Sequence, residues 1–191
     1  MGRQRLRDHI MPIYLLIVSI GSVLWFLPFA IARRRNEAPQ KVNPRARWGI
    51  VMQAVAYAML WQAHFWEHPP TLRRMMLASL LFSLATVLVW SAVFRLGRQW
   101  RFDAALVADH ELVSTGVYGV VRHPIYTSFF CFFLATGLLV TPNWLLLIAA
   151  VLFVIGTEIR VRVEDNLLAA QFGVRFETYR SKVSAYLPRL R

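Results

Sequence analysis

The chain has few acidic side chains, a single cysteine and little charge overall. Of its 191 residues, 17% are charged, and 10 Asp or Glu face 22 Lys or Arg. One cysteine, Cys131, excludes an intrachain disulfide, and no cysteine pair supports a zinc site. The five histidines show no metal-ligand spacing. We therefore expect no metal centre.

Glycine-rich nucleotide-binding motifs are also missing. The sequence has no phosphate loop, no dinucleotide fingerprint and no nucleophilic triad, and its candidate turn glycines Gly116, Gly119 and Gly173 are isolated. The net charge of +12 is compatible with nucleic-acid binding. However, no module combines basic and aromatic residues in the way that such binding requires. We expect no nucleic-acid partner.

Apolar residues, in contrast, make up 57% of the chain and gather in long runs. Residues 10–32, 48–66 and 75–94 each reach the roughly 20 residues that a membrane-spanning helix needs. Runs 125–140 and 144–157 are shorter, and a turn signal separates them. They predict a helical hairpin, with full crossing and a re-entrant pair as the two alternatives. The expected fold class is an all-α polytopic membrane protein with about five transmembrane helices.

The distribution of positive charge predicts an orientation. With five spans and the N-terminus outside, residues 33–47, 95–124 and 158–191 lie inside and hold 6, 4 and 7 of the Lys and Arg residues. This agrees with the positive-inside rule. We expect an integral, multi-pass protein whose basic inner face attracts anionic membrane lipids. Residues 1–191 form one predicted domain, with three transmembrane helices in 1–94 and the hairpin with its flanking polar segments in 95–191.

Two polar clusters flank the predicted hairpin. The first holds Arg122, His123 and Tyr126. The second holds Arg160, Arg162, Glu164 and Asp165. Since the two clusters bracket a hairpin, we expect them to return to the same membrane face. Ionisable side chains at such a junction are costly unless they bind something, so together they predict one site.

Each cluster has a structural and a functional interpretation. Arg160 and Glu164 are four residues apart and share a helix face, either as an ion pair or as binders of two different ligand groups. His123 precedes Pro124, the predicted first residue of a helix. Either His123 caps that helix, or His123 and Tyr126 hold an anionic ligand group at its N-terminus.

Three further patterns concern the two clusters and their surroundings. For Arg122, one interpretation is a residue of the site and the other is merely a positive-inside charge. Glu164 and Asp165 are adjacent, so we expect them to face different directions and not to act as an acid/base pair. Residues 160–180 show apolar positions at three- and four-residue spacing. This spacing predicts an amphipathic C-terminal helix, either on the membrane surface or as a lid over a pocket.

Several motifs occur together in one order between residues 95 and 190. They are residues 96–100, His110-Glu111-Leu112-Val113, Gly116-Val117-Tyr118, Arg122-His123-Pro124-Ile125-Tyr126, Arg160 to Asp165, Phe172-Gly173, Tyr179 and Pro188. Together they resemble the isoprenylcysteine carboxyl methyltransferase and phospholipid methyltransferase family of integral membrane enzymes.

The resemblance implies S-adenosylmethionine (SAM) as methyl donor, bound near the cytosolic face by the second half of the chain. It places His110, Glu111, Leu112, Val113 and Tyr118 at the adenosine end. It places His123, Pro124, Ile125 and Tyr126 at the ribose or amino-acid part. Glu164 would also bind the cofactor, while Arg160 would bind a carboxylate of the substrate, so that these two are the implied catalytic residues. The implied partners are membrane lipids and a lipophilic or lipid-modified substrate.

The chain departs from the family pattern at three positions. Asp165 stands where a second glutamate is common, Phe176 where a tyrosine is common, and Asp103 near the place of a polar residue that is often Gln. A carboxylate acceptor needs no general base, whereas an amine acceptor does. This difference favours a carboxylate or thiolate acceptor. The alternative functions are a phospholipid N-methyltransferase, an NADPH-dependent membrane reductase of the sterol-reductase type, and a non-catalytic membrane scaffold.

Overall fold

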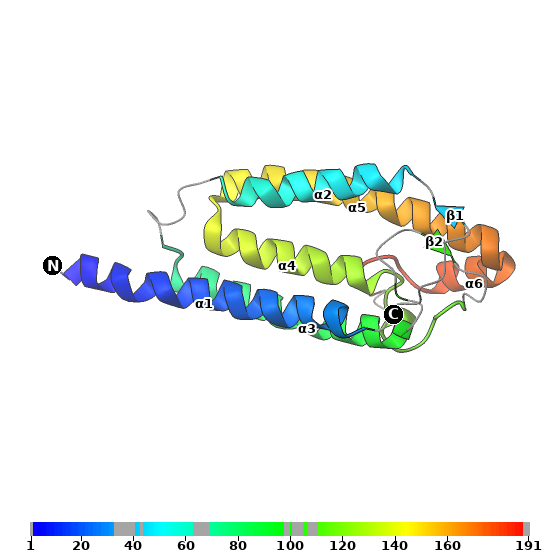
Figure 1. Cartoon of the computed structure of the whole chain (residues 1–191), viewed down its shortest axis with the longest axis horizontal. Coiled ribbons are helices and arrows are strands. Elements are labelled where there is room, and N and C mark those ends of the chain that lie inside the picture. Colours follow the sequence, from blue (N-terminus) through cyan, green and yellow to red (C-terminus); the bar gives the residue numbers. More distant parts are fainter. Residues whose placement is uncertain are drawn as a thin grey trace.

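The computed structural model describes residues 2–32, 41–42, 44–62, 69–97, 100, 105–106 and 111–188. Five long helices lie side by side: α1 (Gly2–Ile31), α2 (Ala46–Leu60), α3 (Leu72–Leu96), α4 (Pro124–Val140) and α5 (Asn143–Phe172) (Figure 1). A 3-10 turn, η2 (Gly116–Gly119), precedes α4, and the short helix α6 (Val174–Lys182) follows α5. Strands β1 (Lys41–Val42) and β2 (Ala105–Leu106) form one antiparallel pair.

Helix α4 lies in the middle of the bundle, between the pair α1 and α3 and the pair α2 and α5 (Figure 1). Its central position explains why it carries the most buried aromatic side chains. Phe132 and Phe133 are both nearly inaccessible, and the Phe133 ring lies 4.5 Å from that of Phe153 on α5. Helix α4 therefore packs against all four of the other long helices, α1, α2, α3 and α5.

The helix lengths confirm an all-α membrane protein. Ile13–Ile31 of α1, Leu72–Leu96 and Asn143–Phe172 are long and apolar enough to cross a membrane. Helix α4 is also apolar but has 17 residues, and α2 has 15. The predicted turn between the hairpin arms is confirmed, because α4 ends at Val140 and α5 begins at Asn143. Pro124 is the first residue of α4, as its fixed φ favours.

Two glycines bring α2 and α5 into backbone contact. A Cβ added at Gly156 would lie 2.8 Å from the Gly49 oxygen, and one at Gly49 would lie 2.5 Å from the Gly156 oxygen. Small residues permit such an approach between membrane helices. The Cγ of Arg160 would also lie 2.5 Å from a Cβ at Gly49, so the arginine stem packs directly on the α2 backbone.

The prediction of one amphipathic helix over residues 160–180 was wrong in its boundaries. Helix α5 continues past its apolar part to Phe172, and the chain then turns at Gly173, whose φ is 51°. Only glycine adopts this conformation without strain, so Gly173 permits the break at this position. The turn starts α6 in a new direction and buries Phe176 completely.

Candidate active site

A cavity of about 710 Å³ lies between the helices where α4 begins. The Arg, His, Asp and Glu side chains that line it come from residues before and after the hairpin: Glu111, Arg122, His123, Arg160, Glu164 and Asp165. Aromatic side chains of α1, α2 and α4, together with Trp100, also line it, among them Trp25, Phe26, Phe29, Tyr57, Phe129 and Phe132. The cavity therefore joins an ionisable region to an apolar one.

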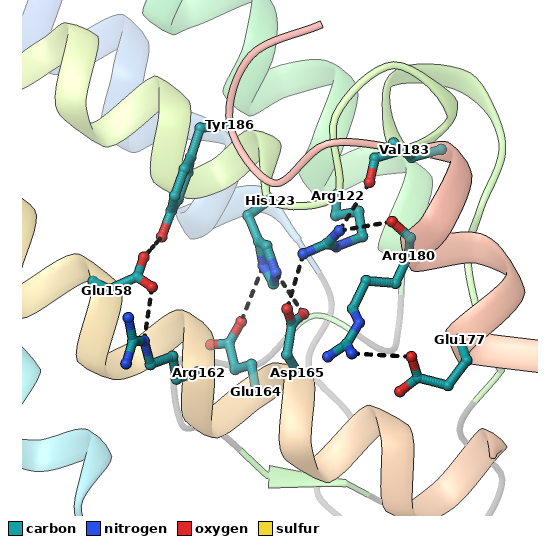
Figure 2. A network of polar contacts seen from close by, with 10 residues as sticks. All are labelled: Arg122, His123, Glu158, Arg162, Glu164, Asp165, Glu177, Arg180, Val183 and Tyr186. Atoms are coloured by element: carbon teal, nitrogen blue, oxygen red, sulfur yellow. Dashed lines mark hydrogen bonds and ion pairs between the residues drawn. The ribbon is translucent and has the colours of Figure 1, made fainter. Parts of the chain in front are cut away.

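His123 is held between two carboxylates of α5 (Figure 2). Its Nε2 lies 2.9 Å from Oδ1 of Asp165, and its Nδ1 lies 3.7 Å from Oε2 of Glu164. Adjacent residues of a helix point in different directions, as expected, but the imidazole lies between them. The two carboxylates that we did not interpret as a pair therefore share one partner.

Arg122 completes this network. It donates from Nη2 to Oδ2 of Asp165 at 2.9 Å and from Nη1 to the carbonyl of Val183 at 2.8 Å (Figure 2). Its side chain is 11% exposed and that of Asp165 is 13% exposed. A buried charge needs such partners. Arg122 is thus a structural member of the site, and the interpretation that it is only a topological charge is wrong.

Tyr126 connects Arg160 with Glu164. Its hydroxyl donates to Oε1 of Glu164, and the Arg160 Cζ lies 5.2 Å from the centroid of its ring. This second contact is within the range of a cation–π interaction. Arg160 is 7% exposed, so its charge acts in a region from which water is largely excluded. The four-residue spacing has placed both side chains around one aromatic ring.

The segment after α6 fixes the backbone at His123. The N–H groups of Arg122 and His123 donate to the carbonyls of Ser184 at 2.8 Å and Ala185 at 3.0 Å. Tyr186 donates to Oε2 of Glu158 at 2.8 Å (Figure 2). His123 occupies the N-cap position of α4 but makes no side-chain capping bond there, so its ring does not cap the helix. Its side chain is directed to α5 instead.

Buried tyrosines line the site outside the membrane segments. The Tyr179 hydroxyl on α6 donates to the Tyr118 carbonyl at 2.5 Å. Burial, followed by the negative charge of Glu164, raises the pKa of Tyr118 well above its ordinary value. Burial raises the pKa of Tyr179 to about 12. Both groups are therefore neutral hydroxyls at physiological pH and can donate hydrogen bonds.

The structure brings nearly all the predicted site residues to this one cavity. Its lining includes Glu111, Leu112, Val113, Tyr118, His123, Pro124, Ile125, Tyr126, Arg160 and Glu164. His110 and Asp103 lie outside the described residues. Sequence reasoning missed the aromatic residues of α1 and the polar Gln53 of α2, because they lie in apolar runs that only packing connects to the site. Among the residues that the structure describes, no group of three or more His, Cys, Asp or Glu side chains could hold a metal ion.

The fold and this cavity define a class: an α-helical membrane protein with an ionisable site at one end of its bundle. Comparison with known sequences defines the family. Residues 73–175, more than half of the chain, match the phospholipid methyltransferase family, and the chain belongs to it.

Individual relatives match stretches of different length. The chain is 28% identical over 145 residues to the nickel-cobalt-cadmium resistance protein NccN of Alcaligenes xylosoxydans xylosoxydans, which covers 75% of this chain and 63% of that protein. It is 39% identical over 82 residues to the protein-S-isoprenylcysteine O-methyltransferase of Schizosaccharomyces pombe, which covers 42% of this chain and 34% of that protein. The corresponding enzyme of Saccharomyces cerevisiae is 38% identical over a stretch of the same length. The chain therefore spans less than two thirds of each of these relatives.

Proposed function

We propose that this chain is a membrane methyltransferase that transfers a methyl group from SAM to a lipophilic acceptor, most simply a carboxylate. One observation carries the proposal: a single cavity joins buried ionisable groups to an aromatic, apolar region in a chain of this family. A charged donor and a lipophilic acceptor need those two environments side by side. The network around His123 supplies the ionisable environment for the donor, and the aromatic lining supplies the apolar environment for the acceptor.

The residues present fit SAM. The cavity volume of about 710 Å³ lies within the ~300–1,000 Å³ of small-molecule sites. Glu111 and Glu164 provide carboxylates toward a positively charged ligand. We assign Glu111, Leu112, Val113 and Tyr118, with His110 beside them in sequence, to the adenosine end. We assign His123, Pro124, Ile125 and Tyr126, together with Glu164, to the remainder. Bound SAM supplies a methyl carbon activated by a positively charged sulfur.

The protein's own residues orient the acceptor and exclude water. The buried Arg160 guanidinium holds the acceptor carboxylate with a geometry that suits two parallel hydrogen bonds. No general base is needed, because a carboxylate is already ionised at neutral pH. Tyr126 fixes the positions of Arg160 and Glu164 relative to each other. Orientation of the reacting groups is a principal source of rate enhancement in such a displacement.

The apolar part of the acceptor reaches this site from the bilayer. Phe26 of α1 and Ala54 and Ala58 of α2 line the cavity and are also exposed on the helix surface. Since these positions lie in apolar helices, the cavity opens toward lipid between α1 and α2. The distribution of basic residues supports a cytosolic position for the ionisable end. The N-terminus lies at the opposite end of the bundle (Figure 1).

An amine acceptor is a second candidate, and one contact favours it. In the tautomer whose Nε2–H donates to Asp165, Nδ1 of His123 carries the lone pair that can take up a proton, and this atom lies 3.7 Å from Oε2 of Glu164. Such a base is what N-methylation of a phospholipid requires, and Glu164 could not readily serve while it binds the donor. Loss of turnover in His123→Gln at saturating SAM, seen for an amine but not for a carboxylate, would identify this reaction.

Purified protein with a labelled methyl donor tests the assignments. Arg160→Ala should abolish methylation of a lipophilic carboxylate while SAM affinity by calorimetry is retained. Glu164→Ala should weaken SAM binding itself. Unchanged turnover in the first variant would reject the substrate role of Arg160, and unchanged affinity in the second would reject the cofactor role of Glu164.

Two further functions are separated by simple measurements. Thermal stabilisation by NADPH and not by SAM would indicate a reductase. Binding of SAM without methyl transfer to any component of a membrane extract would indicate a scaffold. Mass spectrometry of methylated products from such an extract identifies the acceptor.

A further inference from the structure

Residues 183–186, which follow α6, form a C-terminal segment that runs beside the start of α4. Ser184 forms an isolated parallel bridge with Val121, and its carbonyl accepts the N–H of Arg122 at 2.8 Å. All four residues of this segment are described by the structure, and none of them lines the cavity. Any effect of the C-terminal segment on a bound ligand therefore passes through other residues.

His123 depends on the C-terminal segment for its orientation. With φ of −123° and ψ of 59°, its backbone lies outside both the α-helical and the extended region. Helix α4 begins one residue later, at Pro124, so the geometry of the helix does not set the direction of the imidazole. Instead, the His123 N–H donates to the carbonyl of Ala185 at 3.0 Å. The position of the C-terminal segment therefore contributes directly to where the imidazole points.

Tyr186 anchors the end of the C-terminal segment. Its hydroxyl donates to Oε2 of Glu158 on α5 at 2.8 Å (Figure 2). Its carbonyl oxygen lies 3.2 Å from the hydroxyl of Thr127 on α4. The centroid of its ring lies 6.4 Å from that of the His123 imidazole. A single residue thus contacts both arms of the hairpin and lies beside the imidazole.

The acceptor of the Tyr186 hydroxyl is itself held in place. Nε of Arg162 donates to Oε1 of Glu158 at 2.8 Å, so each oxygen of this carboxylate has a partner (Figure 2). A hydrogen bond to an ionised acceptor is roughly twice as strong as one between neutral groups. The bond from Tyr186 is therefore well suited to hold the C-terminal segment against α5.

We propose that Tyr186 is a positioning residue of the donor site, because it fixes the C-terminal segment and, through it, the imidazole of His123. This inference rests on the proposed function, in which His123 belongs to the part of the site that holds SAM. Tyr186 itself does not line the cavity. The affinity for SAM should therefore depend on a side chain that the ligand does not contact.

Calorimetry of SAM with the full chain in detergent tests this proposal. Tyr186→Ala removes both the hydroxyl and the ring, and we expect the SAM affinity to fall about tenfold. Tyr186→Phe removes only the hydroxyl, so we expect a loss of about threefold. Leu187→Ala is the matched control, because it shortens the next side chain, which is 73% exposed and does not line the cavity. Its SAM affinity should equal that of the wild type.

A double-mutant cycle with His123 separates positioning from a purely structural role. In a chain that carries His123→Ala, Tyr186→Ala should lower the SAM affinity by less than about twofold, because the side chain that it positions is gone. Binding too weak for calorimetry is measured from the rise of the melting temperature in excess SAM. If Tyr186→Ala does not fold, the same cycle is run with Tyr186→Phe, whose loss of affinity should disappear in the His123→Ala chain.

Equal losses with and without His123→Ala would show that Tyr186 acts only on the stability of the fold, and would overturn the proposal. Unchanged affinity in Tyr186→Ala, or an equal loss in Leu187→Ala, would also overturn it. If the wild type binds SAM and His123→Ala keeps full affinity, this inference fails together with the role of His123 in SAM binding. If the wild type does not bind SAM, the proposed function itself is overturned.

Discussion

Asp165 is the residue on which the geometry of the site depends most. It accepts one hydrogen bond from Arg122 and one from His123, each at 2.9 Å. Hydrogen bonds to a charged group are worth about 1.5–3 kcal/mol each. Breaking a buried ion pair by removing one partner costs about 3–5 kcal/mol. Arg122 keeps the carbonyls of Val183 and Arg180 as partners. We therefore expect Asp165→Ala to lower the free energy of unfolding by about 3 kcal/mol, at the lower end of this range.

The same substitution should weaken ligand binding. Without Asp165, nothing on α5 fixes the Nε2 side of the His123 ring, and the ring is free to leave the cavity wall. We expect a loss of SAM affinity of about tenfold, measured by calorimetry. Unfolding is followed by denaturant titration in mixed micelles. Asp165→Asn keeps the shape of the side chain and can still bond both partners in part, so its effect on stability should be smaller, about 1–2 kcal/mol.

Glu177→Ala provides the control for lost charge. Glu177 pairs with Arg180 on α6 at 3.1 Å, and both side chains are about half exposed. Exposed pairs contribute roughly 0–1 kcal/mol, so this variant should unfold almost like the wild type. If Asp165→Ala were no less stable than Glu177→Ala, the reasoning that burial makes the Asp165 network strong would be refuted.

Three further predictions concern packing, pH and the far end of the bundle. Gly156→Val should cost about 1–3 kcal/mol of stability by overpacking, since its Cβ would lie 2.8 Å from the Gly49 oxygen; Gly119→Ala, with room for a Cβ, is the control. Because the pKa of Tyr179 is raised above its ordinary value of 10 to about 12, its contribution to the free energy of unfolding is complete below pH 10 and is lost as the pH rises toward 12. A melting temperature that falls as steeply in Tyr179→Phe as in the wild type between pH 10 and 12 would contradict this. Arg74 donates to the carbonyls of Thr141 and Gly137, so Arg74→Gln should lower the melting temperature but leave SAM affinity unchanged, and a large change in affinity would disprove the separation of the two ends.

The class of fold could be predicted because it depends on local patterns. Long apolar runs are incompatible with a small soluble domain, and a helix satisfies its backbone hydrogen bonds within the segment. The position of Pro124 and the turn after Val140 followed from backbone chemistry alone. The end of α5 did not, because Gly173 lies in a continuous helical pattern and the burial of Phe176 depends on what α6 packs against.

The site was predicted as two clusters that meet, because a hairpin returns the chain to the face from which it started. The motifs that resemble a known family supplied names for the residues within those clusters. Neither source could show that His123 lies between Glu164 and Asp165, or that the segment of Ser184 binds its backbone. These contacts join residues about 40 to 60 positions apart, and their spacing carries no periodic signal.

The sequence alone determined that this protein is helical, lies in a membrane and carries ionisable residues at one membrane boundary, because hydrophobicity and charge act residue by residue. Tertiary packing decided which of those residues share a partner, that Gln53 lines the same cavity as Arg160, and that aromatic side chains of α1 complete the cavity. The physical reason is that burial and hydrogen-bond geometry are properties of neighbours in space, and the chain order does not specify those neighbours.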